Sequence, residues 1–275
     1  MMRTLLVCLF GLLSLAIWPQ GASAQGSRCF AMANANPPVQ LAALAPRKLT
    51  PQEVLINFVG HSTFLMETAA GVTIATDYAG FAGFNVTPDV VTMNNAHETH
   101  FTDYPDEKIR HVLRGWNPNG GPAQHNLRLE DVHIRNVPTD RRGWGAGIER
   151  DGNSIFIFET ADLCIGHLGH LHHGLTPQYR ALLGTIDVLM VPVDGTFTLG
   201  HKEMAEVVRL LRSRLILPMH YFGGSSLQSF LTEMHGEFQV KIHDSSQVIV
   251  SQQTLPKTPT MLVLPAGHGF SSGYD

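Results

Sequence analysis

The sequence contains few cysteines and no excess of positive charge, and both shortages exclude classes of protein. Only 3 cysteines occur among 275 residues, so the fold is no disulfide scaffold and must rest on a hydrophobic core, which a chain of this length can bury. Lysine and arginine number 19 against 23 aspartate and glutamate residues. We therefore expect no nucleic-acid partner, because such proteins carry a basic face, and nothing predicts binding to a lipid surface.

Two common catalytic signatures are also missing. The chain has no Gly-x-Ser-x-Gly segment, so Ser-His-Asp or Cys-His catalysis has no support. It has no glycine-rich phosphate-binding loop either, which removes the usual nucleotide-binding motifs. Any catalytic site must therefore use other residues.

Residues 1–24 have the features of a signal peptide. Arg3 precedes an apolar run from Leu5 to Ile17, and Ala22-Ser23-Ala24 supplies the small residues that a signal peptidase reads. The run is short for a membrane-spanning helix. The sequence thus predicts cleavage after Ala24, no stable membrane anchor, and a periplasmic or secreted protein.

Two cysteines, Cys29 and Cys164, follow the predicted cleavage site. An oxidising compartment permits a disulfide between them. Cys164 lies in an apolar segment that reads as a buried strand, however, and a small buried thiol is the favoured state. The sequence leaves the pairing open.

The rest of the chain predicts an arm and one domain. Residues 25–51 are rich in Ala, Pro and Asn and predict an arm, and residues 52–275 form the domain. Short apolar runs predict strands, first alone and then alternating with helices. The strands are expected at Val54–Val59, Thr63–Met66, Val72–Thr76, Asp89–Met93, His111–Arg114, Val132–Val137, Ile155–Phe158, Ile186–Val193, Leu215–Met219, Phe238–Ile242 and Gln247–Val250.

Local signals add turns and helices to this pattern. Asp151-Gly152-Asn153 predicts a turn, and Thr176-Pro177 predicts the start of a helix. Another helix is indicated by apolar residues at i, i+3, i+4 and i+7 from Met204 to Leu211. Ser226 is a candidate cap for a last helix. Together the elements fit an α/β (α+β) domain with two sheets packed face to face and helices outside.

Histidines that follow apolar strands are the candidate site. His97 and His100 come after the strand ending at Met93, and His170 and His220 each follow a further strand. Three neutral imidazoles with an open fourth position would give a divalent ion a bound water with a pKa near 7. His97 is either the fourth ligand, which closes the site, or a base or hydrogen-bond donor, and it is our candidate catalytic residue.

Six segments in order resemble the metallo-β-lactamase superfamily, in the branch related to ascorbate-6-phosphate lactonases. The segments are Val59–Leu65, Thr73–Asp77, Asn95–His100, His167–His173, Asp187–Gly195 and Leu217–Tyr221. The resemblance implies a four-layer αβ/βα sandwich, with metal ligands on loops at one edge. It matches His100, His170 and His220 to metal positions.

The departures from the family pattern point to a single metal ion. Asn95 stands where the family has its first histidine, and Thr99 stands where it has the aspartate of the same loop. The family's third histidine would fall near Thr139-Asp140 and is absent, and His170 stands where the family has the aspartate that bridges two metal ions. Amide and hydroxyl oxygens are poor zinc ligands. One divalent ion, zinc by preference, held by His97, His100, His170 and His220 is therefore expected.

Further residues are assigned to support a ligand or line the pocket. They are Asn95, Thr99, His61, Asp77, His172 and His173. The leading hypothesis is an exported metal-dependent hydrolase of an ester, lactone or phosphoester. A metal- or ligand-binding relative that lost hydrolysis is the alternative, and a metal-free partner-binding protein is the third. The expected partner is a small-molecule substrate, and the sequence does not define the oligomeric state.

Overall fold

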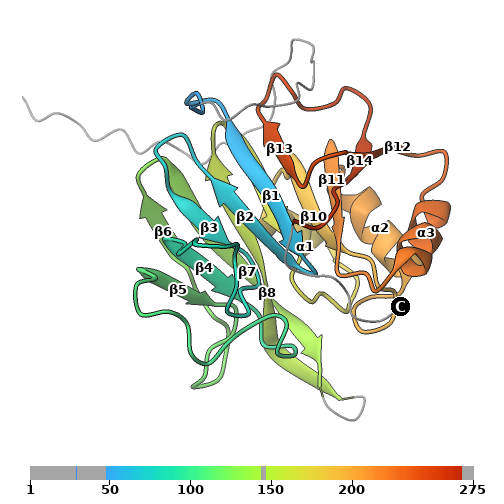
Figure 1. Ribbon diagram of the computed structural model, residues 1–275. Coiled ribbons are helices and arrows are strands. Elements are labelled where there is room, and N and C mark those ends of the chain that lie inside the picture. The colour runs from blue at the N-terminus through green and yellow to red at the C-terminus, as the bar shows by residue number, and fades with distance from the viewer. Residues whose placement is uncertain (1–28, 30–47, 144–146, 268–275) are drawn as a thin grey trace, which may run out of the picture.

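Two mixed β-sheets lie face to face, with helices outside one of them (Figure 1). The computed structural model describes Cys29, residues 48–143 and residues 147–267. The predicted signal peptide and nearly all of the predicted arm therefore lie outside the described residues. Within the described part, no helix is both long and apolar enough to cross a bilayer.

The first sheet has six strands and comes mainly from the N-terminal half. Its order is β13 (Gln247–Val250), β1 (Val54–Gly60), β2 (Thr63–Glu67), β3 (Thr73–Ala75), β4 (Val90–Met93) and β5 (His111–Arg114). β13, β1, β2 and β3 pair antiparallel, whereas β3, β4 and β5 pair parallel.

The second sheet has eight strands. Its order is β12 (Gln239–Ile242), β14 (Thr260–Val263), β11 (Leu215–Met219), β10 (Val188–Pro192), β9 (Leu163–His167), β8 (Ile148–Thr160), β7 (Val132–Arg142) and β6 (Asn126–Leu129). The half from β9 to β12 is parallel, so the carboxyl ends of β9, β10 and β11 lie at one edge.

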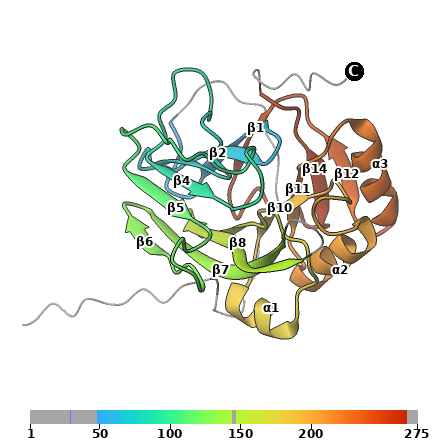
Figure 2. The same ribbon diagram turned by 90° about the horizontal axis from the view of Figure 1, so that it is seen from below.

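Apolar side chains fill the space between the sheets and the space under the helices. Ile56, Phe64, Phe156 and Leu217 are fully buried in the cluster between the sheets. The helices α1 (Pro177–Leu183), α2 (His201–Leu211) and α3 (Gly224–Glu233) cover the outer face of the second sheet (Figure 2). A third cluster around Met93 lies on the outer face of the first sheet, under loops. This arrangement confirms the predicted two-sheet α/β sandwich.

Several local expectations hold and several are wrong. α2 buries Met204, Val207, Val208 and Leu211, as their helical spacing predicts. β11 and β13 have the predicted bounds, and α1 begins at Pro177 after Thr176.

The predicted turn at Asp151–Asn153 is wrong because β8 runs through it, with a register shift on the paired strand between Thr139 and Arg141. The helix assigned to Ser226 begins earlier, at Gly224. β6 and β14 had no matching expectation.

The two cysteines form a disulfide, which corrects the expectation of a free buried thiol. Cys29 and Cys164 are bonded with a Cα–Cα separation of 5.9 Å across 135 residues. Cys164 is buried in β9, as expected. Cys29 is also held by a backbone hydrogen bond, which Thr185 donates to its carbonyl. The disulfide joins Cys29 to β9 of the second sheet.

Removing the disulfide should destabilise the protein. Cross-linking a loop of this length limits the unfolded chain, and native disulfides contribute about 2–4 kcal/mol. We expect Cys29→Ser to lower the free energy of unfolding by about that amount in urea titrations. Dithiothreitol should destabilise the parent to the same level and leave the variant unchanged. Equal stability of parent and variant under oxidising conditions would contradict this assignment.

Candidate metal centre

Strand ends from both sheets bring histidines to one edge of the sandwich. His97 and His100 follow β4, and His220 follows β11 directly. His61 lies in the turn between β1 and β2. His61 and His220 both have left-handed backbone conformations, with φ of 52° and 53°, and the His220 N–H donates to the His61 carbonyl at 2.6 Å. The two turns thus fix each other and direct both imidazoles to a common point.

Four histidines form a compact group. Each of His61, His97, His100 and His220 offers one ring nitrogen, and these nitrogens all lie within 4.8 Å of one another. Nε2 of His100 and Nε2 of His220 are 2.9 Å apart. His97 was an expected ligand and joins the group, as do His100 and His220. His61, which the sequence placed only in the surrounding pocket, joins it as well.

His170 lies against the group without being one of its four members. Its ring centroid is 4.9 Å from that of His100, 5.1 Å from His97 and 5.2 Å from His220. The side chain is buried, and neither ring nitrogen has a hydrogen-bond partner among the described residues; the same holds for Nε2 of His97. Buried polar atoms are normally paired, so these three nitrogens lack a partner that the folded site should provide.

A buried polar network holds His100. Its Nδ1 is 2.6 Å from Oδ2 of Asp77, and Oδ1 of Asp77 accepts a 2.8 Å hydrogen bond from the Asn94 amide. The Asn94 carbonyl oxygen accepts from the backbone N–H of Ser154 on β8. Asp77, which the sequence assigned to support a ligand, therefore fixes a ring of the first sheet and is linked to the second sheet.

Asp194 plays the corresponding part beside His220, and the sequence reasoning missed it. Its Oδ1 lies 3.2 Å from Nδ1 of His220, within ion-pair distance but without the alignment of a hydrogen bond, so this nitrogen also lacks a hydrogen-bond partner among the described residues. Oδ2 accepts backbone N–H groups from Thr196 and Thr198. Burial opposes ionisation, but the interaction with His220, with bonds from the threonines, holds the pKa of Asp194 well below its usual range. Its place directly after the apolar run of β10 was the available signal.

The loop that carries His170 is packed against two asparagines. Gly169 has φ of 60°, and a β-carbon there would overlap the side chains of Asn94 and Asn153. The Asn153 carbonyl oxygen accepts the His170 N–H at 2.7 Å, and its amide donates to Thr139. Only glycine permits this close approach, so the position of His170 depends on Gly169.

The remaining predicted site residues divide into near and distant ones. The Thr99 hydroxyl lies 2.8 Å from Nε2 of His61 and 2.7 Å from Nδ1 of His97, so it joins two rings of the group. The Asn95 amide donates to Glu149 instead. His172 bonds the Asp140 carbonyl, and His173 accepts from the Asp140 N–H, so both bond to strand β7 of the second sheet.

Burial favours the neutral form of His61, His97, His100 and His170. It lowers the pKa of His61 and of His170 to about 3, with repulsion from His220 adding to the effect, and the pKa of His97 to about 4 for the same two reasons. Burial also lowers the pKa of His100 well below its usual value. Burial raises the pKa of Asp77 to about 8, against hydrogen bonds from Asn94 and Ser62. Neutral imidazoles are the form that binds metal ions.

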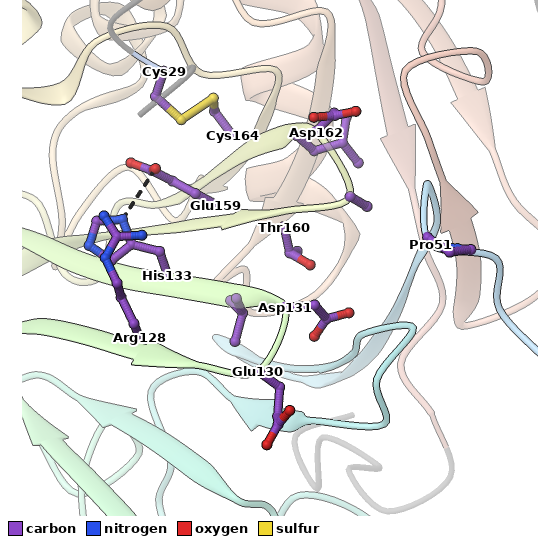
Figure 3. Close-up of a pocket in the computed structure, with 13 residues that line it drawn as sticks. Cys29, Pro51, Arg128, Glu130, Asp131, His133, Glu159, Thr160, Asp162 and Cys164 are labelled. Atoms are coloured by element: carbon purple, nitrogen blue, oxygen red, sulfur yellow. Dashed lines mark hydrogen bonds and ion pairs between the residues drawn. A yellow bond between two sulfur atoms is a disulfide. The ribbon is translucent and has the colours of Figure 1, made fainter. Parts of the chain in front are cut away.

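A cavity of about 420 Å³ lies elsewhere, at the opposite end of β9 (Figure 3). The disulfide and the turns at Glu130-Asp131 and Ala161-Asp162 line it, and His133 pairs with Glu159 on its wall. None of the grouped histidines lines it. The clustered unpaired nitrogens, not this cavity, therefore mark the candidate site.

Comparison with known proteins places the chain among metal-dependent hydrolases. Residues 55–220 match the model of the beta-lactamase superfamily domain. A UPF0173 metal-dependent hydrolase of Thermococcus onnurineus is 36% identical over 218 residues, covering 72% of this chain and 96% of that protein. A UPF0173 metal-dependent hydrolase of Thermococcus kodakarensis is 26% identical over 220 residues, with the same coverage.

A solved structure supports the same relationship. A Thermotoga maritima protein assigned as a candidate Zn-dependent hydrolase of the metallo-beta-lactamase superfamily superposes with a TM-score of 0.56. The two sequences are 30% identical, and the match covers 77% of this chain and 98% of that one.

The buried histidines predict a loss of stability in acid. His61, His97, His170 and His167 have folded pKa values of about 3 to 4, all lowered mainly by burial, whereas an unfolded histidine titrates near 6.5. The unfolded chain therefore binds more protons than the folded chain between about pH 4 and pH 6.5. The contribution of these histidines to the free energy of unfolding is full above about pH 6.5 and falls as the pH decreases toward 4. Asp77 contributes in the opposite direction, because its folded pKa is raised and the folded chain therefore keeps a proton that the unfolded chain has lost.

We expect the urea midpoint of the metal-free protein to fall steeply from about pH 6.5 to about pH 4.5. His243→Ala, which changes a partly exposed histidine outside the group, should show the same slope. A midpoint that is constant over this range would contradict neutral burial of these rings.

Proposed function

The chain belongs to the beta-lactamase superfamily, and on that premise we propose that it is a metal-dependent hydrolase that uses one zinc ion to hydrolyse an ester, lactone or phosphoester. The relatives named as metal-dependent hydrolases support the general activity. The zinc, the single ion and the substrate class are our inference from the residues of the site.

The contact between His100 and His220 carries the proposal. A carboxylate lies beside Nδ1 of each ring, Asp77 at 2.6 Å and Asp194 at 3.2 Å. When it is ionised, a carboxyl group in that place favours the tautomer with the proton on Nδ1; Asp77 reaches this form above its raised pKa of about 8. Both Nε2 atoms then carry lone pairs, yet they face each other at 2.9 Å. A cation bound by both nitrogens removes this repulsion.

The donor set fits a divalent ion that prefers imidazole. His100 and His220 provide the central pair, and His97 and His170 have buried nitrogens without partners among the described residues. Imidazole donors suit zinc and its neighbours among transition metals. When bound, zinc supplies a water of pKa about 7 and polarises an acyl or phosphoryl oxygen.

The acidic residues near the group support one ion instead of two. Asp77 bonds Nδ1 of His100, Asp194 lies beside Nδ1 of His220 and accepts from Thr196 and Thr198, and Thr99 has only a hydroxyl to offer. A second ion would need further anionic or imidazole ligands. His61 is bonded to Thr99, so its ring can orient His97 through the shared hydroxyl or complete the ligand set.

The metal content of single variants tests the ligand set. Protein purified without chelators should hold one ion per chain by plasma mass spectrometry. Replacing His100 or His220 by Ala should lower zinc affinity by more than about tenfold, because each removes a direct bond to the ion. His243→Ala is the matched control, because it replaces a partly exposed histidine outside the group, and it should retain the parent's affinity for zinc.

Two further variants decide whether His170 or His61 is a ligand. The sequence favours His170, whereas the compact group contains His61. Loss of zinc in His170→Ala with retention in His61→Ala supports the set His97, His100, His170 and His220. The reverse result supports the compact group. Two ions per chain that survive dialysis would overturn the single-ion proposal.

A binding protein without hydrolysis is the second candidate, and Thr99 favours it. Thr99 stands where the family has an aspartate, and its hydroxyl is already bonded to the rings of His61 and His97. A threonine cannot take a proton at neutral pH. His97, with its pKa of about 4, is a weak base in the metal-free site. If the parent hydrolyses lactones or phosphoesters, and His97→Ala loses this activity but keeps its zinc, the result supports the hydrolase. If the parent binds zinc but hydrolyses none of these substrates, the result supports the binding protein.

We also propose that the protein is exported. The support is the sequence of Arg3, the apolar run from Leu5 and Ala22-Ser23-Ala24, and a disulfide, a bond that is typical of oxidising compartments. The mature N-terminus should be Gln25, which mass spectrometry of the periplasmic fraction measures. An intact Met1 on membrane-bound material would make the segment an anchor.

A further inference from the structure

Two exposed phenylalanines stand beside the histidine group. Phe197 and Phe222 leave 56% and 53% of their surfaces in water. Their ring centroids are 5.8 Å apart in an edge-to-face arrangement. Phe222 lies 5.4 Å from the ring of His61 and 5.5 Å from that of His220, and Phe197 lies 6.2 Å from that of His97. We call Phe197 and Phe222 the aromatic pair.

The loop that carries Phe197 is held by polar contacts, so its exposure is built in. The Asp194 carboxylate accepts the backbone N–H groups of residues 196, 197 and 198. Arg142 donates to the Thr196 carbonyl at 2.9 Å. Phe222 follows His220 by two residues after β11. Both rings are thus placed by the same residues that place the site.

The chemistry of the aromatic pair selects among the proposed substrates. Exposed aromatic rings in mutual contact at the rim of a polar site mark a place for an apolar ligand group. The faces of the rings carry partial negative charge, which disfavours a phosphate dianion in contact with them. The acidic side chains in contact with His100 and His220, Asp77 and Asp194, place carboxyl groups beside the site as well. An acyl substrate with an apolar substituent fits these surroundings better than a phosphoester.

We propose that the aromatic pair binds an apolar alkyl or aryl group of a carboxylic ester or lactone whose acyl carbon lies at the histidine group. This inference rests on the proposed hydrolase function and narrows its substrate class. Hydrolysis adds one water across the acyl C–O bond: the hydroxyl joins the acyl carbon and the proton goes to the leaving oxygen. A lactone gives one hydroxy acid, so the apolar substituent stays on the product.

Matched lactones test the pair. δ-Valerolactone and δ-decalactone share the same ring, and only the second carries an alkyl chain. For the zinc-loaded full-length protein, kcat/KM from proton release should be at least about tenfold higher for δ-decalactone, mainly through KM, because burying several CH2 groups is worth this much. Phe197→Ala and Phe222→Ala should each reduce that preference at least about threefold, and Phe197→Leu should restore most of it.

Phe84→Ala is the matched control. Phe84 is 73% exposed and forms a similar edge-to-face pair with Phe81, with centroids 5.5 Å apart. The preference for δ-decalactone should be unchanged in this variant. An equal preference in the parent and both alanine variants of the aromatic pair, or faster turnover of p-nitrophenyl phosphate than of either lactone, would overturn the proposal.

Binding without turnover separates the two proposals. Calorimetric titration of the metal-free protein with octanoate and acetate measures the aromatic pair alone. Octanoate that binds more tightly than acetate, with the difference reduced in Phe222→Ala, supports the apolar surface even if no lactone is hydrolysed, and then only the hydrolase proposal fails. Lactone hydrolysis without any dependence of octanoate binding on the pair retains the hydrolase and overturns the aromatic pair.

Discussion

The hydrogen bond between Asp77 and His100 is the constraint on which the site depends. Both side chains are fully buried, and a buried carboxyl is costly unless it is bonded. Asn94 bonds the second oxygen of Asp77 and accepts from Ser154 in the other sheet. The network therefore orients the ring, satisfies the carboxyl and joins the sheets at once. Exchanging any of these groups for an apolar one would leave another buried polar atom without its partner.

The backbone around the site is held in conformations that ordinary residues seldom adopt. His61, Asp77 and His220 are all left-handed, with φ of 52°, 40° and 53°. Each such residue costs roughly 1 kcal/mol or more and persists only where the surroundings enforce it. Here the three turns deliver the site's side chains. The hydrogen bond from His220 to the His61 carbonyl shows how the turns support one another.

The disulfide and the histidine group lie at opposite ends of β9. Its first half carries Cys164, bonded to Cys29. Its last residue, His167, is buried and donates to the Ser62 carbonyl at 2.9 Å while its Nδ1 accepts from Gly169. The covalent tie thus secures one end of the second sheet. The other end is left to polar contacts, which keep the loops with His170 and His61 in fixed relation.

Local patterns in the sequence determined the elements and the identity of several site residues. Helical spacing located α2, and the histidines after β4 and β11 were found because a strand delivers the residue that follows it to the sheet edge. The position of His61 in the group, the role of Asp194 and the disulfide were decided only by tertiary structure. They depend on which turns face each other across two sheets, over separations as long as 135 residues. Periodicity reports which face a side chain occupies, whereas contacts between distant segments follow from the packing of the whole domain.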